Sequence, residues 1–411
     1  MNYKAILFLF ISFGLSCNKK EPLQSRDIIG LWKIELDIDQ ERTIPFFLEI
    51  IDQQGKMSCA IWNGNEKIEH KTVDICQDSL IVNSPYFNST MYMRFNKNVV
   101  TGHWVDHSRE AYKMPLHGKY NLSQRFKFKG LLEHKIDGKW AVKFSPDTED
   151  AYDAIGLFST DSNSMKGTFI TETGDYRYLE GGFATNELKL STFDGAHAFL
   201  FEAELSNDTL RGWFYSGKNW KEPFIAWRND SATLINPYDM TELVDKSKPI
   251  SFAFKDLDGN IVSLEDSVYQ DKPVLVQIMG SWCPNCMDES AFLAKNAGYI
   301  KENDVEIIAL SFERLDYESA LKPLQKIKNN LGLNYLILYA GHANKKEATL
   351  AIPWLKEIKS YPTLLYVLPD KRVFKIHTGF YGPGTGNYFD IQSKEMLEDI
   401  KNLGDLSKAI R

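Results

Sequence analysis

An internal repeat constrains the fold of this chain more than any other feature of its sequence. Gly30-Leu31-Trp32 recurs as Gly138-Lys139-Trp140, a shift of 108 residues. The same shift aligns apolar residues at alternate positions: Met57 with Met165, Ile61 with Phe169, Leu80 with Leu188, Val82 with Leu190 and Met93 with Phe201. Farther along, the shift becomes 110 and aligns Gly102 with Gly212 and Trp104 with Phe214. Such alternation is typical of strands with one buried face, so the sequence predicts two copies of one β module.

The two copies span residues 24–122 and 126–229, and we expect each to be an all-β meander folded as a small barrel or sandwich. Seven of the nine tryptophans precede residue 230, as expected for a β-rich region: Trp32, Trp62, Trp104, Trp140, Trp213, Trp220 and Trp227. The Gly-x-Trp at the start of each copy resembles the opening of lipocalin-like barrels. The modules could bind a ligand or partner, or serve as a spacer on which the rest of the chain docks.

The first residues resemble a bacterial lipoprotein signal. Lys4 precedes an apolar stretch from Ala5 to Leu15, and Leu15-Ser16-Cys17 follows. The stretch is too short to span a bilayer, so it predicts a signal peptide over residues 1–16, a lipid on Cys17 and a tether over 17–23. The alternative is an ordinary cleaved signal peptide. Either reading predicts a protein of the bacterial cell envelope, facing the periplasm, where disulfides persist.

Two further cysteines, Cys59 and Cys76, lie in the first module. The repeat places Gly167 and Ala184 at their positions in the second copy, so both are absent from it together. In an oxidising compartment an even pair suggests a structural disulfide. The alternative is two separate thiols that never meet.

The pattern of apolar residues changes after a linker over residues 230–248. Val274–Met279 is a continuous apolar run, as expected for a strand buried on both faces, and it leads through Gly280-Ser-Trp-Cys-Pro-Asn-Cys286 into a helical pattern. Further strands are predicted at 305–312, 336–339, 364–368 and 373–377, and helices at 317–330, 346–358 and from Ser393, after a flexible loop over 382–392. This alternation predicts an α/β domain with a central sheet over residues 249–411.

The Cys-Pro-Asn-Cys turn carries the chemistry of this domain. Cys283 falls at the start of a helix, where free N–H groups and the helix dipole stabilise a thiolate, so it is the predicted nucleophile. Cys286 lies one turn farther on the same face and can resolve a mixed disulfide. Pro284 suits the first helical turn, and Trp282 shields the sulfur. No second Cys or His pair at ligand spacing accompanies the motif in this domain, so we predict neither a metal nor another cofactor.

Residues 249–411 resemble the thioredoxin superfamily, specifically its TlpA/ResA-like thiol-disulfide oxidoreductases, through Trp282-Cys283-Pro284-Asn285-Cys286 and Tyr361-Pro362-Thr363. The resemblance implies an α/β thioredoxin fold and a cis Pro362 that lays the preceding backbone beside the two sulfurs. It also implies that this backbone pairs with an extended substrate segment. The implied partners are protein thiols and disulfides, with a membrane thiol protein as electron donor or acceptor.

One departure concerns proton transfer. Thioredoxin has a buried Asp six residues before its first cysteine, and this chain has Gln277, which cannot titrate. Glu289 is then a candidate for proton transfer at Cys286, or simply a solvated carboxylate on the helix.

Two other functions stay open. A peroxiredoxin-like peroxidase needs Pro-x-x-x-Thr/Ser-x-x-Cys, and residues 276–283 have neither the Pro nor the Thr. A binding lipoprotein would use the β modules and keep the redox domain as an accessory. Nucleic acid is an improbable partner, because 48 Lys and Arg face 55 Asp and Glu and no long basic run occurs.

Overall fold

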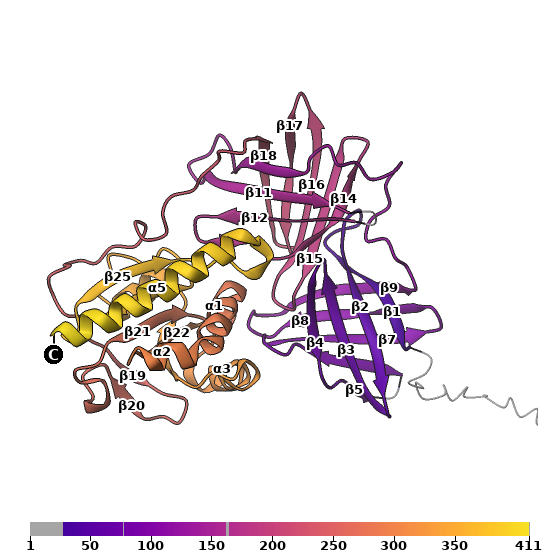
Figure 1. Ribbon diagram of the computed structural model, residues 1–411. Coiled ribbons are helices and arrows are strands. Elements are labelled where there is room, and N and C mark those ends of the chain that lie inside the picture. The colour runs from indigo at the N-terminus through magenta and orange to yellow at the C-terminus, as the bar shows by residue number, and fades with distance from the viewer. Residues whose placement is uncertain (1–27, 77, 162–163, 411) are drawn as a thin grey trace, which may run out of the picture.

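The computed structural model describes residues 28–76, 78–161 and 164–410, so the predicted signal peptide, Cys17 and the tether lie outside the described residues. Two β modules and a C-terminal α/β domain pack around one junction (Figure 1). In this part of the chain, no helix is both long and apolar enough to cross a membrane.

Module 1 is an incomplete barrel. Its strands are β1 (Gly30–Asp37), β2 (Thr43–Gln53), β3 (Lys56–Asn63), β4 (Glu66–His70), β5 (Asp74–Cys76), β6 (Ser79–Asn83), β7 (Ser89–Asn96), β8 (Val99–Asp106) and β9 (Tyr112–Tyr120). Apart from β4 and β5, consecutive strands pair antiparallel, and β1 pairs with β9. Among the described residues β4 and β5 share no ladder, which leaves the barrel open along this seam.

Module 2 closes completely. Its strands are β10 (Gly138–Phe144), β11 (Tyr152–Thr160), β12 (Met165–Thr171), β13 (Gly174–Asp175), β14 (Leu179–Ala184), β15 (Glu187–Phe193), β16 (Ala198–Ser206), β17 (Thr209–Ser216) and β18 (Trp220–Arg228). The pairings β11–β12 and β10–β18 complete the ring, and β13 adds a short hairpin to β12. The expected all-β meander is confirmed in both modules. Of the two expected forms, barrel and sandwich, the modules have the barrel.

The repeat is visible in the hydrogen bonds. The Trp32 indole N–H donates to Ile28 O at 2.8 Å, and the Trp140 indole N–H donates to Ile136 O at 2.7 Å. These pairs differ by 108 residues, as predicted.

The later part of the alignment needs a correction. Leu80 pairs with Met93, whereas Leu188, its counterpart, pairs with Ala203. Met93 therefore corresponds to Ala203 and not to Phe201, and the shift of 110 begins one strand earlier than the sequence suggested.

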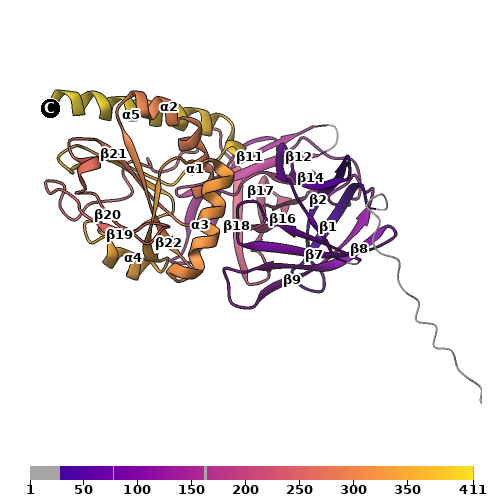
Figure 2. The ribbon, with the colours of Figure 1, turned by 90° about the horizontal axis from the view of Figure 1, so that it is seen from below.

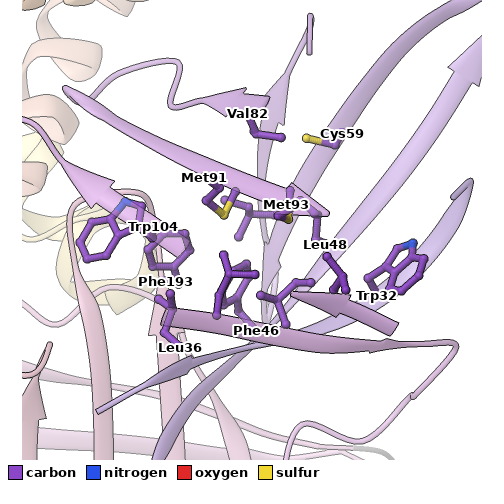
Figure 3. Close-up of a cluster of buried hydrophobic side chains, with 14 of the residues drawn as sticks. Trp32, Leu36, Phe46, Leu48, Cys59, Val82, Met91, Met93, Trp104 and Phe193 are labelled. Atoms are coloured by element: carbon purple, nitrogen blue, oxygen red, sulfur yellow. The ribbon is translucent and has the colours of Figure 1, made fainter. Parts of the chain in front are cut away.

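Module 1 completes its core with side chains of module 2. Phe193, Ala198, Leu200 and Tyr215 belong to the same buried cluster as Trp32 and its neighbours. The ring of Phe193 lies 4.5 Å from that of Phe46 and 5.2 Å from that of Trp104, between centroids (Figure 3). The two modules therefore share one apolar core across their boundary.

The predicted pair Cys59 and Cys76 is not bonded in this structure. Both are free cysteines. Cys59 points into the core from β3, as Figure 3 shows, whereas Cys76 is exposed on β5 across the unpaired seam.

The C-terminal domain is built on a mixed sheet in the order β20-β19-β23-β22-β21-β24-β25. These strands are β19 (Ala253–Lys255), β20 (Ile261–Ser263), β21 (Val274–Met279), β22 (Glu306–Glu313), β23 (Leu336–His342), β24 (Thr363–Val367) and β25 (Val373–Thr378). Strands β21, β22 and β23 are parallel, and β24 runs antiparallel to β21. The predicted α/β thioredoxin fold is confirmed.

Helices cover both faces of this sheet. They are α1 (Pro284–Lys295), α2 (Ala297–Glu302), α3 (Tyr317–Leu331), α4 (Lys345–Ala351) and α5 (Asn387–Ile410). One face packs under α1, α2, α3 and α5, and the other packs under α4 and the segments around Leu243 and Phe252. Helix α4 ends earlier than predicted, because Pro353 disfavours helical backbone before it.

The predicted linker and the predicted flexible loop are both ordered against the domain. The linker over 230–248 places Leu243 in the core, and Tyr238 donates its hydroxyl to Asp399 at 2.7 Å. The expected flexible loop over 382–392 is instead a short 3-10 turn, η3 (Pro383–Thr385), and the first turn of α5. Thr385 Oγ1 accepts from Phe389 N at 3.1 Å, which starts the helix before Ser393.

Candidate active site

Cys283 sits at the N-terminal cap of α1, directly after the fully buried central strand β21. Its sulfur accepts a hydrogen bond from the backbone N–H of Cys286 at 3.4 Å. The thiol is near a second backbone group, Tyr361 O, also at 3.4 Å. The predicted position of Cys283 at the start of a helix is therefore what the structure has.

The two cysteines differ in access. Cys283 keeps a 7% exposed fraction, whereas Cys286 is completely buried. Burial raises the pKa of the Cys286 thiol well above its usual range, and the neighbouring Cys283 adds to this shift. Cys283 is thus the sulfur that an incoming group can reach, and Cys286 lies behind it.

Tyr361, Pro362 and Thr363 lie beside this pair. The Tyr361–Pro362 peptide bond is cis. The Trp282 indole N–H donates to Phe312 O at 3.0 Å, and its ring meets the Tyr361 ring edge-on, 5.4 Å between centroids. Thr363 begins β24 and donates its hydroxyl to Ser360 O at 2.9 Å. The residues that carry the resemblance to the thioredoxin superfamily therefore lie together at one site.

Gln277 and Glu289 form a buried polar pair within the domain core. Gln277 Nε2 donates to Glu289 Oε2 at 2.8 Å and also contacts Ser290. Glu289 is fully buried, and its Oε1 has no hydrogen-bond partner among the described residues. Burial raises the pKa of Glu289 to about 8, so the alternative of a solvated helix carboxylate is wrong.

A second buried carboxylate, Glu313, holds the loop that leads to Cys283. It accepts from Ser281 N at 2.8 Å, from Ser281 Oγ at 2.6 Å and from Ser311 Oγ at 2.5 Å. Burial raises the pKa of this carboxyl group. Glu313 is the last residue of β22, the parallel strand next to β21, and it lies at the edge where α/β sheets place their sites.

Asn285, the second residue between the two cysteines of the motif, touches module 2. Its side-chain amide donates to Asp175 Oδ2 at 3.3 Å and to Phe380 O at 3.1 Å. Asp175 also accepts from Gly382 N at 2.5 Å. A Cβ on Gly174 would lie 2.6 Å from the Asn285 amide nitrogen, so only glycine fits this approach. The hairpin of β12 and β13 is therefore docked on the redox turn.

A buried arginine ties all three bodies together at this junction. The Arg177 guanidinium contacts Glu66 of module 1 at 2.6 Å, Asp194 of module 2 at 3.4 Å, and Asp288 on α1. One cation cannot neutralise this many carboxylates in a buried site. Burial raises the pKa of Asp288 to about 7, and the neighbouring carboxylates add to this shift. Seen from below, α1 and α3 form the side of the domain that faces the modules (Figure 2).

A cavity of about 90 Å³ opens at Cys283, and its walls come from all three bodies. Module 1 contributes Arg109 and module 2 contributes His197, while Trp282 and Arg314 come from the C-terminal domain. Sequence patterns did not identify Asp175, Arg177, Arg109, His197 or Arg314. Arg314 alone carried a usable signal, because it lies just past the predicted strand 305–312, and α/β sheets place their sites at the ends of strands.

Comparisons with known proteins agree on the C-terminal domain. The AhpC/TSA family model matches residues 246–367. Thiol-disulfide oxidoreductase ResA of Halalkalibacterium halodurans is 26% identical over 130 residues, which cover 32% of this chain and 66% of that protein, just under two thirds. The ResA of Bacillus subtilis is 23% identical over 153 residues, covering 37% of this chain and 72% of that protein.

Solved structures resemble part of this chain. A thiol:disulfide interchange protein of the thioredoxin family from Chlorobium tepidum covers 36% of this chain and 94% of its own, with 17% identity and a TM-score of 0.28. Peroxidoxin BcpB from Mycobacterium tuberculosis covers 39% of this chain and 96% of its own, with 15% identity and a TM-score of 0.29. Together with the observed sheet order, the family match identifies the C-terminal domain of this chain as a thioredoxin-family domain of the AhpC/TSA family.

Proposed function

We propose that the protein is a thiol-disulfide oxidoreductase of the bacterial cell envelope that exchanges disulfides with protein thiols through Cys283 and Cys286. One observation carries this proposal. The accessible Cys283 sulfur caps a helix and receives the N–H of Cys286, whose own sulfur is buried one turn away. The names of the ResA relatives support the same chemistry.

The reaction needs only these two sulfurs and the substrate. The Cys283 thiolate attacks a substrate disulfide, a new bond to Cys283 forms, and the departing substrate thiolate takes up the proton that Cys283 lost. The Cys286 thiolate then attacks the Cys283 sulfur and releases the second substrate thiolate, which takes up the Cys286 proton. Two electrons pass to the substrate, and the reverse sequence oxidises a dithiol.

The neighbouring residues divide the supporting roles. The backbone before cis Pro362 lies against Cys283 and would pair with an extended substrate segment. The side chains of Trp282 and Tyr361 would shield the Cys283 sulfur. Glu289 would exchange the proton of Cys286, since its carboxyl group is buried and one of its oxygens accepts from no donor among the described residues. Its pKa of about 8 is suited to proton exchange near neutral pH.

We also place the protein in the envelope by a lipid on Cys17, where a membrane thiol protein would renew the redox state of the pair. The apolar stretch before Cys17 supports this location. A Cys17→Ser variant should move from the membrane fraction to the soluble fraction of cells. Continued membrane recovery of that variant would contradict the anchor.

Insulin reduction with dithiothreitol tests the activity. Wild-type protein should accelerate it, Cys283→Ser should remove the acceleration, and Cys286→Ser should accumulate a mixed disulfide with the substrate. Acceleration that survives Cys283→Ser would contradict the proposal. Peroxide offered in place of insulin tests the peroxidase alternative, which predicts turnover that depends on Cys283 alone.

The role of Glu289 needs a separate measurement. Glu289→Gln should slow the release of the mixed disulfide and change the pH profile of this step. Glu395→Gln, at an exposed position of α5, is the matched control. An unchanged pH profile in Glu289→Gln would mean that the carboxylate has only a structural role.

A further inference from the structure

Arg314 is a cation in the cavity at the redox sulfur that makes no ion pair with a described carboxylate. It lines the same cavity as Cys283, and its guanidinium lies 4.2 Å from the centroid of the Trp282 ring. In the part of the chain that the structure describes, neither an ion pair nor a hydrogen bond joins Arg314 to a carboxylate. Its charge is therefore available to a group that enters the cavity.

The other charged groups around the cavity already have partners. Arg109 pairs with Asp106 at 2.9 Å. The oxygens of Glu313 accept from Ser281 and Ser311, and Asp194 lies 3.4 Å from both Arg177 and His197. Arg314 is thus the cation of the cavity lining that makes no ion pair with a described carboxylate, whereas Arg109 and His197 each have one.

Arg314 shares the cavity with the reacting atom and keeps its charge there. Burial lowers the pKa of its guanidinium and Arg109 adds to this effect, while Asp106, Cys283 and Glu313 act in the opposite direction. Arginine stays protonated under such conditions, because its ordinary pKa lies far above neutral pH. A substrate that reaches the Cys283 sulfur therefore meets a positive charge.

The cation is also held in place. Its platform, Trp282, is fixed by the bond to Phe312 O and by the Tyr361 ring. A planar guanidinium stacked on a fixed ring presents its N–H groups in one direction, which suits a carboxylate. The cavity of about 90 Å³ is well below the usual size of a ligand pocket, so it admits a small group and not a folded surface.

We infer that Arg314 binds a carboxylate carried next to the reacting sulfur, and that the site prefers disulfides and thiols with an acidic group beside the sulfur. This inference rests on the proposed function and names its substrate class. The acidic group can belong to a small disulfide or to an acidic residue beside a cysteine in an extended peptide. In both cases the reaction is the two-step exchange described above, with dithiothreitol renewing the dithiol.

Three small disulfides of different charge test the inference: dithiodipropionate, hydroxyethyl disulfide and cystamine. The readout is the ratio of kcat/KM for the dianion to that for the neutral disulfide, each corrected for the uncatalysed reaction. This ratio cancels a general loss of activity. We expect wild-type protein to favour the dianion about tenfold and to discriminate against cystamine, with both effects shrinking at high salt.

The variants isolate the residue. Arg314→Gln should bring the ratio close to one, and Arg314→Lys should retain part of the preference. Arg372→Gln, which removes the same charge from an exposed turn of the same domain, should keep the wild-type ratio. A ratio near one in wild-type protein, or a wild-type ratio in Arg314→Gln, would overturn the inference.

A pair of peptides identifies the source of the carboxylate. They have equal length and differ only in an acidic or a neutral residue beside a disulfide-bonded cysteine. A preference for the acidic peptide that Arg314→Gln abolishes supports a peptide substrate, and a preference confined to the small dianion supports a small disulfide. Turnover of all substrates without charge preference overturns this inference alone. Absence of turnover with every disulfide overturns the proposed function, and the inference with it.

Discussion

Module 2 makes two interfaces of opposite character. Toward module 1 it shares an apolar core, into which Phe193 packs, and two buried arginines, Arg125 and Arg177, also cross this boundary. Toward the C-terminal domain it presents charged and polar groups around Arg177 and Asp175. Apolar burial is insensitive to pH and salt, whereas buried ion clusters respond to both. The comparison indicates that the two modules fold as one unit and that the redox domain docks on them electrostatically.

The largest expected effect comes from emptying the shared core. Phe193→Ala should lower the free energy of unfolding of the β modules by about 4 kcal/mol, because it opens a cavity between Phe46 and Trp104. Urea unfolding followed by tryptophan fluorescence measures it, since most tryptophans lie in the modules. Leu131→Ala, at a 90% exposed side chain, is the control, and equal losses in both variants would refute a shared core.

Arg125→Met should cost about 3 kcal/mol in the same assay. The Arg125 guanidinium donates to Trp62 O at 2.7 Å in module 1 and to Glu180 Oε2 at 2.8 Å in module 2, so its loss leaves a partly buried carboxylate unpaired. Arg42→Met removes a more exposed ion pair to Glu202 across the same boundary and should cost under about 1 kcal/mol. If the two variants lose equal stability, burial of Arg125 is not the cause.

The polar interface should depend on pH. Because the folded pKa of Asp288 is raised to about 7 from 3.8, the unfolded chain holds fewer protons between these values. Stability from this group is therefore complete below about pH 4 and falls as pH rises toward 7. Between pH 5 and 7, the free energy of unfolding of Asp288→Asn should rise by about 2 kcal/mol relative to that of wild type. Phe193→Ala should retain the wild-type pH dependence, and a flat wild-type profile would contradict the assignment.

The smallest effect concerns the contact between α3 and module 1. Lys326 Nζ donates to Ser84 O at 3.1 Å and to Phe87 O at 3.0 Å. Lys326→Met should reduce the free energy of unfolding by about 1 kcal/mol, because these two carbonyls lose a charged donor. Lys322→Met, on the exposed side of the same helix, should be neutral, and similar losses in the two variants would argue against this contact.

Local patterns predicted what depends on neighbours in the chain. Alternating apolar residues gave the strands of both modules, and the run at Val274–Met279 before Cys283 gave the redox turn. The prediction failed where a distant partner decides the conformation. Gly382 donates to Asp175 in module 2, so the supposed flexible loop is ordered. Burial of Glu289 depends equally on contacts across the sheet.

The sequence by itself determined the repeat, the helix-capping position of Cys283 and the place of Pro362, because each follows from residue type and short spacing. Only the tertiary structure decided that one barrel closes and the other borrows a core, and that Arg109, His197 and Arg314 meet at one sulfur. These residues lie about a hundred positions apart or more in the chain. They come together only because the two modules and the C-terminal domain pack against one another, and no short segment of sequence specifies that packing.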